Sequence, residues 1–445
     1  MIEYAEPEAI CQLYPVVETL SHEAVMVISF IAILCYAQIL GLISFAFANI
    51  IIPSTFSEDR DGSNDKGESS GVRMLQETCE VSTTTPISSR GFARTCCDVY
   101  PSQFGGFRGG YFEAGKASDQ QYFVKKEIKS GDVIYVVSPD FPMFLDTFFV
   151  LPASVRITLV TGCEDVGVPW EMFHPDRKGV SGFSMKTLWP SGQKMTMREF
   201  IGDKRLVKWY TQNYDMVGNT SFTSSDVDIV ADKGLLAKVF PIPIGLDFHT
   251  LAEKNSADPV SICQQRKDIE ETLSKAPAFL KRKLSVYGKF DCADKSRMRT
   301  MTRGVICDLL ASHQRNNTQN NDTLIFSPPT NRRLNTRSAK LSFWADAVKV
   351  QFLIAPPGRG TDTHRAWEIL ALHAVPIVIS SPLDRLYSMF PVVIVKDWSQ
   401  VFAEGSLRRF QSQIVARFGD DPFSKKVDDM LRADYWREVV RAKDL

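Results

Sequence analysis

Residues 350–380, which read VQFLIAPPGRGTDTHRAWEILALHAVPIVIS, hold the side chains of this chain that are best suited to bind a phosphate. Gly358 and Gly360 follow an apolar run, and glycine allows the backbone to turn sharply and to approach a ligand closely. A helical pattern comes next, and Asp362 or Thr363 can cap its first turn. Because the amides and the dipole at the start of a helix favour negative charge, we expect an anion such as a diphosphate here.

Two charged residues stand on the same helical pattern. Arg365 and Glu368 are three residues apart, so they share one helix face near its start. The guanidinium can neutralise a phosphate, and the carboxylate can accept hydrogen bonds from ribose hydroxyls. The predicted nucleotide site consists of Gly358, Gly360, His364, Arg365 and Glu368. The competing interpretation is a surface ion pair on an amphipathic helix whose apolar residues pack the core.

A dinucleotide-binding turn is a further alternative for the same segment. Asp384 follows at about the distance of a ribose-binding acid. However, Thr363 stands where the third glycine of that fingerprint belongs, and the segment lies near the end of the chain instead of opening a βαβ unit. Both departures disfavour this interpretation.

Two other places offer a catalytic base. Glu164 and Asp165 follow the apolar run 155–161, and we select Asp165 as a carboxylate that can deprotonate an acceptor hydroxyl. A solvated loop acid is the alternative. Asp247 and His249 lie between the two halves of the strand pattern, and His249 is the second candidate because imidazole accepts protons near neutral pH. A hydrogen-bonded linker histidine is its alternative.

No metal site and no cofactor are expected. Asp226-Val227-Asp228 is a DxD triplet of the kind that holds a divalent cation, but a chain with 52 acidic residues contains such triplets by chance. The nine cysteines form no CxxC pair and no Cys/His cluster at zinc spacing. In an oxidising compartment the seven cysteines after residue 52 can form at most three bridges, with the pairing left open.

Short β-branched runs alternate with helical patterns over the rest of the chain, which predicts parallel sheets covered by helices. The predicted strands are 132–138, 155–161, 206–212, 238–244, 284–288, 323–327, 350–355, 375–380 and 391–396, and the predicted helices are 141–151, 264–275, 294–312, 337–349 and 363–374. A gap near residues 247–280 divides the strands into two sheets. Ligands of such sheets bind beyond the carboxyl ends of the strands.

The first part of the chain predicts a membrane anchor and a stem. Residues 24–52 contain no Asp, Glu, Lys or Arg and exceed the roughly 20 residues that cross a bilayer. Ala46-Phe47-Ala48 resembles a signal-peptidase site, but the apolar run is long and no Lys or Arg precedes it. Residues 54 to about 95 are rich in Ser, Thr, Gly and Asp, which predicts a flexible stem. Sequons at Asn219, Asn316 and Asn321 are compatible with a luminal position.

Net charge argues against one class of partner. Lys plus Arg and Asp plus Glu both number 52, so no net field attracts the chain to nucleic acid. No nucleic-acid partner is expected.

The segment PPGRGTDTHRAWEILALHAVPIVISS resembles the C-terminal motif of exostosin-type glycosyltransferases, family 47, in which a Pro-Gly turn precedes an Arg-x-x-Glu helix and a Pro-Ile/Val-Val strand. Arg365, Glu368, Pro376 and Val378 match that pattern. A looser likeness extends through residues 158–169, 209–215 and 242–251, so it covers roughly 130–400. Where the family pattern has an acid-rich Gly-Asp-Ser-Asp, this chain has GCED at 162–165.

The resemblance implies two Rossmann-like domains of GT-B architecture behind a type II membrane anchor, in the Golgi, with the catalytic part luminal. The expected organisation is a short tail 1–23, a transmembrane anchor 24–52, a stem 53–125, an N-terminal acceptor domain 126–250 and a C-terminal nucleotide-sugar domain 251–445.

The implied function is transfer of a sugar from a nucleotide-sugar donor to a glycan or glycoprotein acceptor. Donor binding falls on the second domain, where the site above was placed, and the helix start and basic side chains neutralise the diphosphate without a metal. The alternative is an inactive membrane-anchored glycan-binding or scaffold protein on the same fold.

Overall fold

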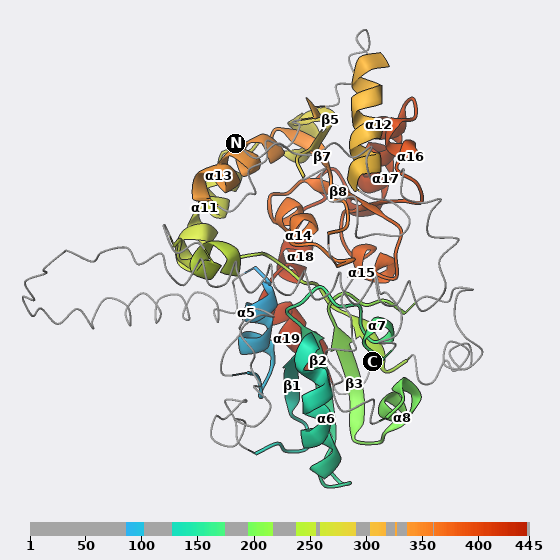
Figure 1. Cartoon of the computed structure of the whole chain (residues 1–445). Helices are drawn as coiled ribbons and strands as arrows, with labels where there is room; N and C mark the ends of the chain where they lie inside the picture. The colour runs from blue at the N-terminus through green and yellow to red at the C-terminus, as the bar shows by residue number, and fades with distance from the viewer. Residues whose placement is uncertain are drawn as a thin grey trace, which may run out of the picture. The chain divides into compact units, whose positions relative to one another are not determined.

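The computed structural model describes residues 86–101, 127–173, 195–216, 237–254, 259–290, 303–316, 325–326, 336–358 and 360–442. These residues belong to one unit, which extends over Lys66–Leu445. They build two parallel sheets with helices against them (Figure 1). The predicted α/β class with two parallel sheets is confirmed, and all nine predicted strands are present.

The first sheet has the strand order β1-β2-β3-β4. Its strands are β1 (Val133–Val137), β2 (Ile157–Gly162), β3 (Leu206–Thr211) and β4 (Val239–Pro241), and its short helices are the 3-10 turn Ser138–Asp140, α6 (Phe141–Val150), α7 (Trp170–Phe173) and α8 (Met197–Gly202). Both faces of the sheet are covered, because Tyr135 belongs to one buried cluster and its neighbours Ile134 and Val136 belong to another. On the second face Phe141 stacks on Trp209, with 5.5 Å between ring centroids.

The second sheet has the order β6-β5-β7-β8-β9. Its strands are β5 (Lys283–Gly288), β6 (Ile325–Phe326), β7 (Val350–Ile354), β8 (Val375–Ile379) and β9 (Val393–Val395). The helices of this half are α11 (Ile262–Ser274), α12 (Arg303–Asn316), α13 (Arg337–Ala347), α14 (His364–Ala371), α15 (Asp384–Tyr387), α16 (Ser399–Phe402), α17 (Ser406–Phe418) and α18 (Lys425–Met430), together with a π-helical turn Thr250–Lys254 and a 3-10 turn Phe279–Lys281.

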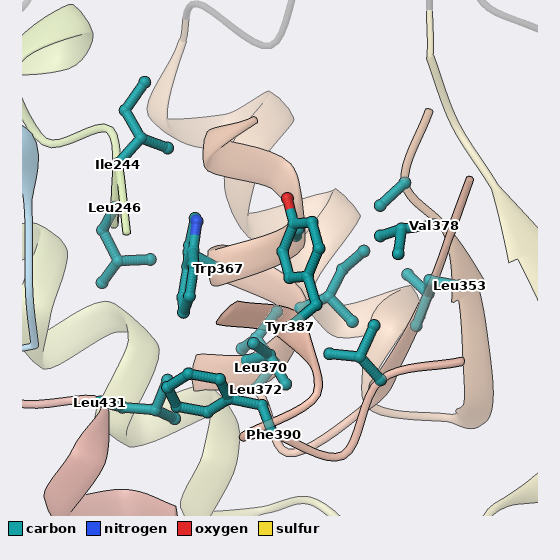
Figure 2. Close-up of a cluster of buried hydrophobic side chains, with 14 of the residues drawn as sticks. Ile244, Leu246, Leu353, Trp367, Leu370, Leu372, Val378, Tyr387, Phe390 and Leu431 are labelled. Atoms are coloured by element: carbon teal, nitrogen blue, oxygen red, sulfur yellow. The ribbon is translucent and has the colours of Figure 1, made fainter. Parts of the chain in front are cut away.

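The helix that was predicted to bind the nucleotide is fixed by a large aromatic cluster. Residues 242–254, which follow β4, form the described part of the crossover from the first sheet to the second. Figure 2 shows the Trp367 indole between Leu246 of this crossover and Tyr387 of α15. Trp367 lies 6.0 Å from the Tyr387 ring and 5.2 Å from the Phe390 ring, measured between centroids. All three aromatic side chains are buried. Removing an indole from such a core typically costs about 3–5 kcal/mol, so the position of α14 is strongly determined.

The structure places part of the expected stem inside the folded unit. Residues 86–101 contain helix α5 (Ser89–Cys96), and Ile87 and Phe92 are buried in the main core. Backbone hydrogen bonds join Leu246 N–H to Ile87 O at 2.8 Å and Ile87 N–H to Leu431 O at 2.8 Å. The Ser, Thr and Gly content of this region predicted a flexible stem, but two large apolar side chains are enough to anchor a short helix.

The C-terminal helix also departs from the expected boundaries. Helix α19 (Ala433–Arg441) packs along α5 (Figure 1). Tyr210 of β3 donates to Val439 O at 3.0 Å, and Arg441 pairs with Asp98 at 2.7 Å. Residues 433–442, expected in the C-terminal domain, therefore complete the side of the first sheet.

Among the described residues no helix is long and apolar enough to span a membrane. The expected anchor 24–52, the tail 1–23 and stem residues 53–85 and 102–126 lie outside the described residues. The same holds for Asp226, Asp228 and the sequon residues Asn219 and Asn321.

Candidate functional site

The predicted glycine turn lies against the end of β3. Asn213 Oδ1 accepts a hydrogen bond from Asp362 N–H at 2.8 Å, and its Nδ2 donates to Glu164 O at 2.9 Å. A Cβ built on Gly360 would lie only 2.5 Å from Asn213 Oδ1. The lack of a side chain at Gly360 therefore leaves room for the Asn213 side chain. Asn213 was not predicted from the sequence. The sequence feature that could have indicated it is an asparagine directly after a strand, because asparagine tolerates the observed φ of 52° better than most residues do.

Asp362 connects the crossover to α14. Its carboxylate accepts from Ile244 N–H at 2.8 Å, Trp367 Nε1 at 2.8 Å, Tyr387 OH at 2.7 Å and Thr363 N–H at 2.9 Å. Burial raises the pKa of Asp362, although these donors oppose the shift. Of the two capping residues expected, Asp362 bonds the backbone at the helix start, whereas the N-cap Thr363 makes no side-chain capping bond. The Asp362 carboxylate thus holds the start of α14 beside the crossover.

Arg365 extends to the carboxyl end of the second sheet. Its Nη1 donates to Lys289 O, the first carbonyl beyond β5. The guanidinium carbon lies 4.8 Å from the centroid of the Phe343 ring, which favours a cation. Burial lowers the pKa of Arg365 to about 10, so the group remains charged at neutral pH.

A second guanidinium, which the sequence analysis missed, stands near the first. Arg303 Nε donates to Pro357 O at 2.9 Å, in the turn that follows β7. A Cβ on Gly358 would lie 3.2 Å from Arg303 Nη2. The charge of Arg303 also contributes to lowering the pKa of Arg365, after the larger effect of burial, which indicates that the two cations are close. Arg303 and Arg365 thus place positive charge beside the predicted phosphate turn.

Glu368 has a different ion-pair partner from the one considered in the sequence. Its Oε1 lies 2.5 Å from Nζ of Lys340, a residue of α13, and the side chains are only 7% and 5% exposed. Lys340 Nζ also donates to Asp247 O at 3.2 Å. Burial opposes the charge of Lys340, but Glu368 and Asp247 outweigh it and the pKa of Lys340 is raised. The pair is buried, and the charge of Glu368 also acts on Arg365, whose pKa it raises against the larger effect of burial. Binding of ribose by Glu368 stays a prediction.

Asp247, His249 and His364 form a cluster where the crossover meets the start of α14. His249 Nδ1 lies 3.1 Å from Asp247 Oδ1, and the two imidazole rings lie 5.7 Å apart between centroids. His364 Nδ1 lies 2.7 Å from Gly245 O, and Thr250 N–H donates to Asp247 Oδ1 at 3.0 Å. Burial opposes ionisation of Asp247, but His249, Lys340 and His364 outweigh it and its pKa is lowered.

Asp165, the other predicted base, lies in the loop after β2 and is half-buried. A carboxyl pair supports this loop: Glu171 Oε2 accepts from Gly167 N–H at 2.7 Å, and Asp215 accepts from Trp170 N–H at 2.8 Å and Glu171 N–H at 2.7 Å. Burial, with a smaller contribution from the charge of Glu171, raises the pKa of Asp215 to about 7. A catalytic role for Asp165 stays a prediction.

No protein-family model matches this chain, and no curated protein matches it. Among solved structures it is similar to an α,α-trehalose-phosphate synthase (UDP-forming) from Burkholderia xenovorans in complex with glucose-6-phosphate, with 13% identity, a TM-score of 0.34, and coverage of 71% of this chain and 72% of that one. It is also similar to an E. coli structure described as trehalose-6-phosphate bound with UDP-2-fluoro glucose, with 12% identity, a TM-score of 0.33, and coverage of 71% of this chain and 74% of that one.

The wall teichoic acid polymerase TagF gives 10% identity and a TM-score of 0.22, with coverage of 70% of this chain and 89% of that one. At these identities and TM-scores the likenesses assign neither a family nor an activity. The function of this chain therefore has to be inferred from its own side chains.

Proposed function

We propose that this chain is a glycosyltransferase that transfers a sugar from a nucleoside-diphosphate sugar to a glycan or glycoprotein acceptor. The observation that carries the proposal is the convergence of Arg303 and Arg365 on the turn before α14, at the carboxyl ends of β5 and β7. Carboxyl ends of parallel strands are where α/β sheets bind ligands, and two guanidinium groups beside a helix start suit a diphosphate.

The diphosphate of the donor would lie against these guanidinium groups and the first amides of α14, near Gly358. Positive side chains and the helix start supply the charge that stabilises the departing nucleoside diphosphate, so the reaction needs no metal. Activity should therefore survive EDTA. For Glu368 to bind the ribose, its carboxylate must accept hydrogen bonds from the ribose hydroxyls while it stays paired with Lys340.

His249 is the proposed general base. Its Nδ1 faces the Asp247 carboxylate, which orients the ring and stabilises the imidazolium that forms when Nε2 takes a proton from the acceptor hydroxyl. The hydroxyl oxygen then bonds to the anomeric carbon as the bond from that carbon to the diphosphate oxygen breaks. Asp165 in the loop after β2 is the second candidate for this role.

A luminal position in the Golgi, behind a type II anchor at residues 24–52, belongs to the same proposal. Cys263 and Cys307 are both disulfide-bonded, and disulfides persist in oxidising compartments such as the secretory lumen. Protease protection of the C-terminus in sealed microsomes tests this topology. Digestion of the C-terminus before detergent is added would contradict it.

The activity is tested by incubating the full chain with a panel of nucleotide sugars and measuring release of the nucleoside diphosphate. We expect release from one donor, and a loss of about 100-fold in His249→Gln, the usual scale for a general base. His373→Gln is the matched control, because His373 also pairs with a carboxylate, at 2.8 Å from Asp428, but outside the site. If the chain neither hydrolyses any donor nor binds a nucleoside diphosphate, it is the inactive glycan-binding module instead.

A further inference from the structure

The cluster of Asp247, His249 and His364 carries a second chemistry besides acid and base catalysis. Two imidazoles and one carboxylate are a ligand set that suits divalent transition metals, with open positions left for water or substrate. One ligand atom from each of the three residues can be chosen so that all lie within 4.8 Å of one another. We propose that these three side chains bind a divalent transition-metal ion, for which Zn²⁺ is the probe.

The distances fit this ion with a small movement. Zn–N and Zn–O bonds of about 2.0–2.2 Å place neighbouring ligand atoms of a tetrahedral site about 3.3–3.5 Å apart. His249 Nδ1 and Asp247 Oδ1 are 3.1 Å apart, close to that spacing. Because one ligand atom of each residue lies within 4.8 Å of the others, any atom that is too far from its neighbours has to approach by at most about 1.5 Å.

The outer contacts of the cluster are those of a metal site. His364 Nδ1 lies 2.7 Å from Gly245 O, and because a carbonyl only accepts, Nδ1 carries the proton and Nε2 of the neutral ring carries the lone pair. Metal-binding histidines usually donate their other N–H to a backbone carbonyl or carboxylate in this way. The Asp247 carboxylate is in turn held by Thr250 N–H at 3.0 Å.

The local charge allows a cation to enter. Lys340 Nζ is paired with Glu368 at 2.5 Å and donates to the backbone oxygen of Asp247 at 3.2 Å, so its charge acts on the Asp247 carboxylate without an ion pair to it among the described contacts. The Asp247 carboxylate can therefore still offset the charge of an entering ion. The side chains of Asp247 and His249 are 18% and 17% exposed, so solvent reaches the cluster and an ion can enter from it.

On the proposed function, the ion would be an inhibitor. A metal on Nδ1 of His249 leaves the proton of the neutral ring on Nε2, so Nε2 could not accept the proton of the acceptor hydroxyl; Zn²⁺ would lower transfer and EDTA would restore it. This consequence depends on the transferase proposal, whereas binding of the ion does not. No metal site was expected from the sequence, and His249 and His364 are too far apart in it to form a recognisable ligand spacing.

The test measures Zn²⁺ binding to the metal-stripped full chain by competition with a chromophoric chelator. We expect one ion per chain, and an affinity at least tenfold lower for each of His249→Gln, His364→Gln and Asp247→Asn. His373→Gln should bind as the unaltered chain does, since its His–Asp pair has no third ligand in the described contacts. Melting temperatures with and without Zn²⁺ show whether each variant is folded, and only the cluster variants should lose the increase caused by the ion.

Two results would overturn the proposal: no specific ion in the unaltered chain, or an ion that all three cluster variants bind with unchanged affinity. Transferase activity is recorded separately. A chain that binds Zn²⁺ through the cluster but shows no transfer would refute the function and keep the metal site, and the reverse pattern would refute the metal site alone.

Discussion

The buried pair of Lys340 and Glu368 allows a quantitative test of how α14 is held. Glu368→Gln leaves the Lys340 ammonium, whose side chain is 5% exposed, without the carboxylate that lies 2.5 Å from it. Loss of one partner from a buried ion pair costs about 3–5 kcal/mol. The folded unit Lys66–Leu445 spans about 380 residues and has an unfolding entropy of about 0.8 kcal/mol/K, so the melting temperature should fall by about 4–6 °C.

Two further variants make this measurement decisive. The double variant Glu368→Gln/Lys340→Met removes both charges, so most of the lost stability should return. Glu271→Gln is the control, because its pair with Lys275 is more than half exposed on both sides and should contribute no more than about 1 kcal/mol. A melting temperature of Glu368→Gln within about 2 °C of the unaltered chain would contradict this role of the buried pair, and so would a double variant no more stable than the single one.

Three other outcomes are expected. Arg365→Ala should weaken nucleoside-diphosphate binding by one to two powers of ten, about 1.5–3 kcal/mol, measured by calorimetry against Arg409→Ala, an exposed control; equal affinities would remove Arg365 from the site. The pKa of Asp215 is raised to about 7 in the folded chain, so the stability that its protonated form contributes is lost as pH rises from about 4 to 7. At pH 8 both carboxyl groups are charged, and Glu171→Gln, which removes one of the two charges, should stabilise the chain by about 1 kcal/mol; at pH 4 the effect should be small. Identical melting profiles of the variant and the unaltered chain at the two pH values would contradict this. Reducing agent should lower the melting temperature, since loss of a disulfide at Cys263 or Cys307 costs about 2–5 kcal/mol; no change would contradict a stabilising role for these disulfides.

The strands and helices could be predicted because their signal is local. An apolar run buried on both faces predicts a strand without knowledge of its neighbours, and β1 to β9 all fall on such runs. Domain limits were less accessible to this reasoning. Ile87, for example, is hydrogen-bonded to Leu246 and Leu431, which lie far away in the sequence.

The site was predicted in part for the same reason. The glycine turn and the helix of Arg365 are contiguous, so their proximity follows from the sequence. The partners of these residues come from other elements: Lys340 from α13, Arg303 from α12 and Asn213 from the end of β3. No local pattern encodes such a choice, and the aspartate and histidines of the cluster are likewise brought together only by the fold.

Helix α19 has a mechanical consequence. The chain passes from the first sheet to the second through residues 242–261, and it returns through residues 431–433 to place α19 against α5. If a single covalent connection joined the two halves, they could twist as well as bend relative to each other. The second connection, at residues 431–433, resists twisting, so bending about the line through the two connections is the easier motion. Cutting the chain before Ala433 would release that restraint and uncover Cys96, whose thiol donates to Ala433 O at 3.4 Å.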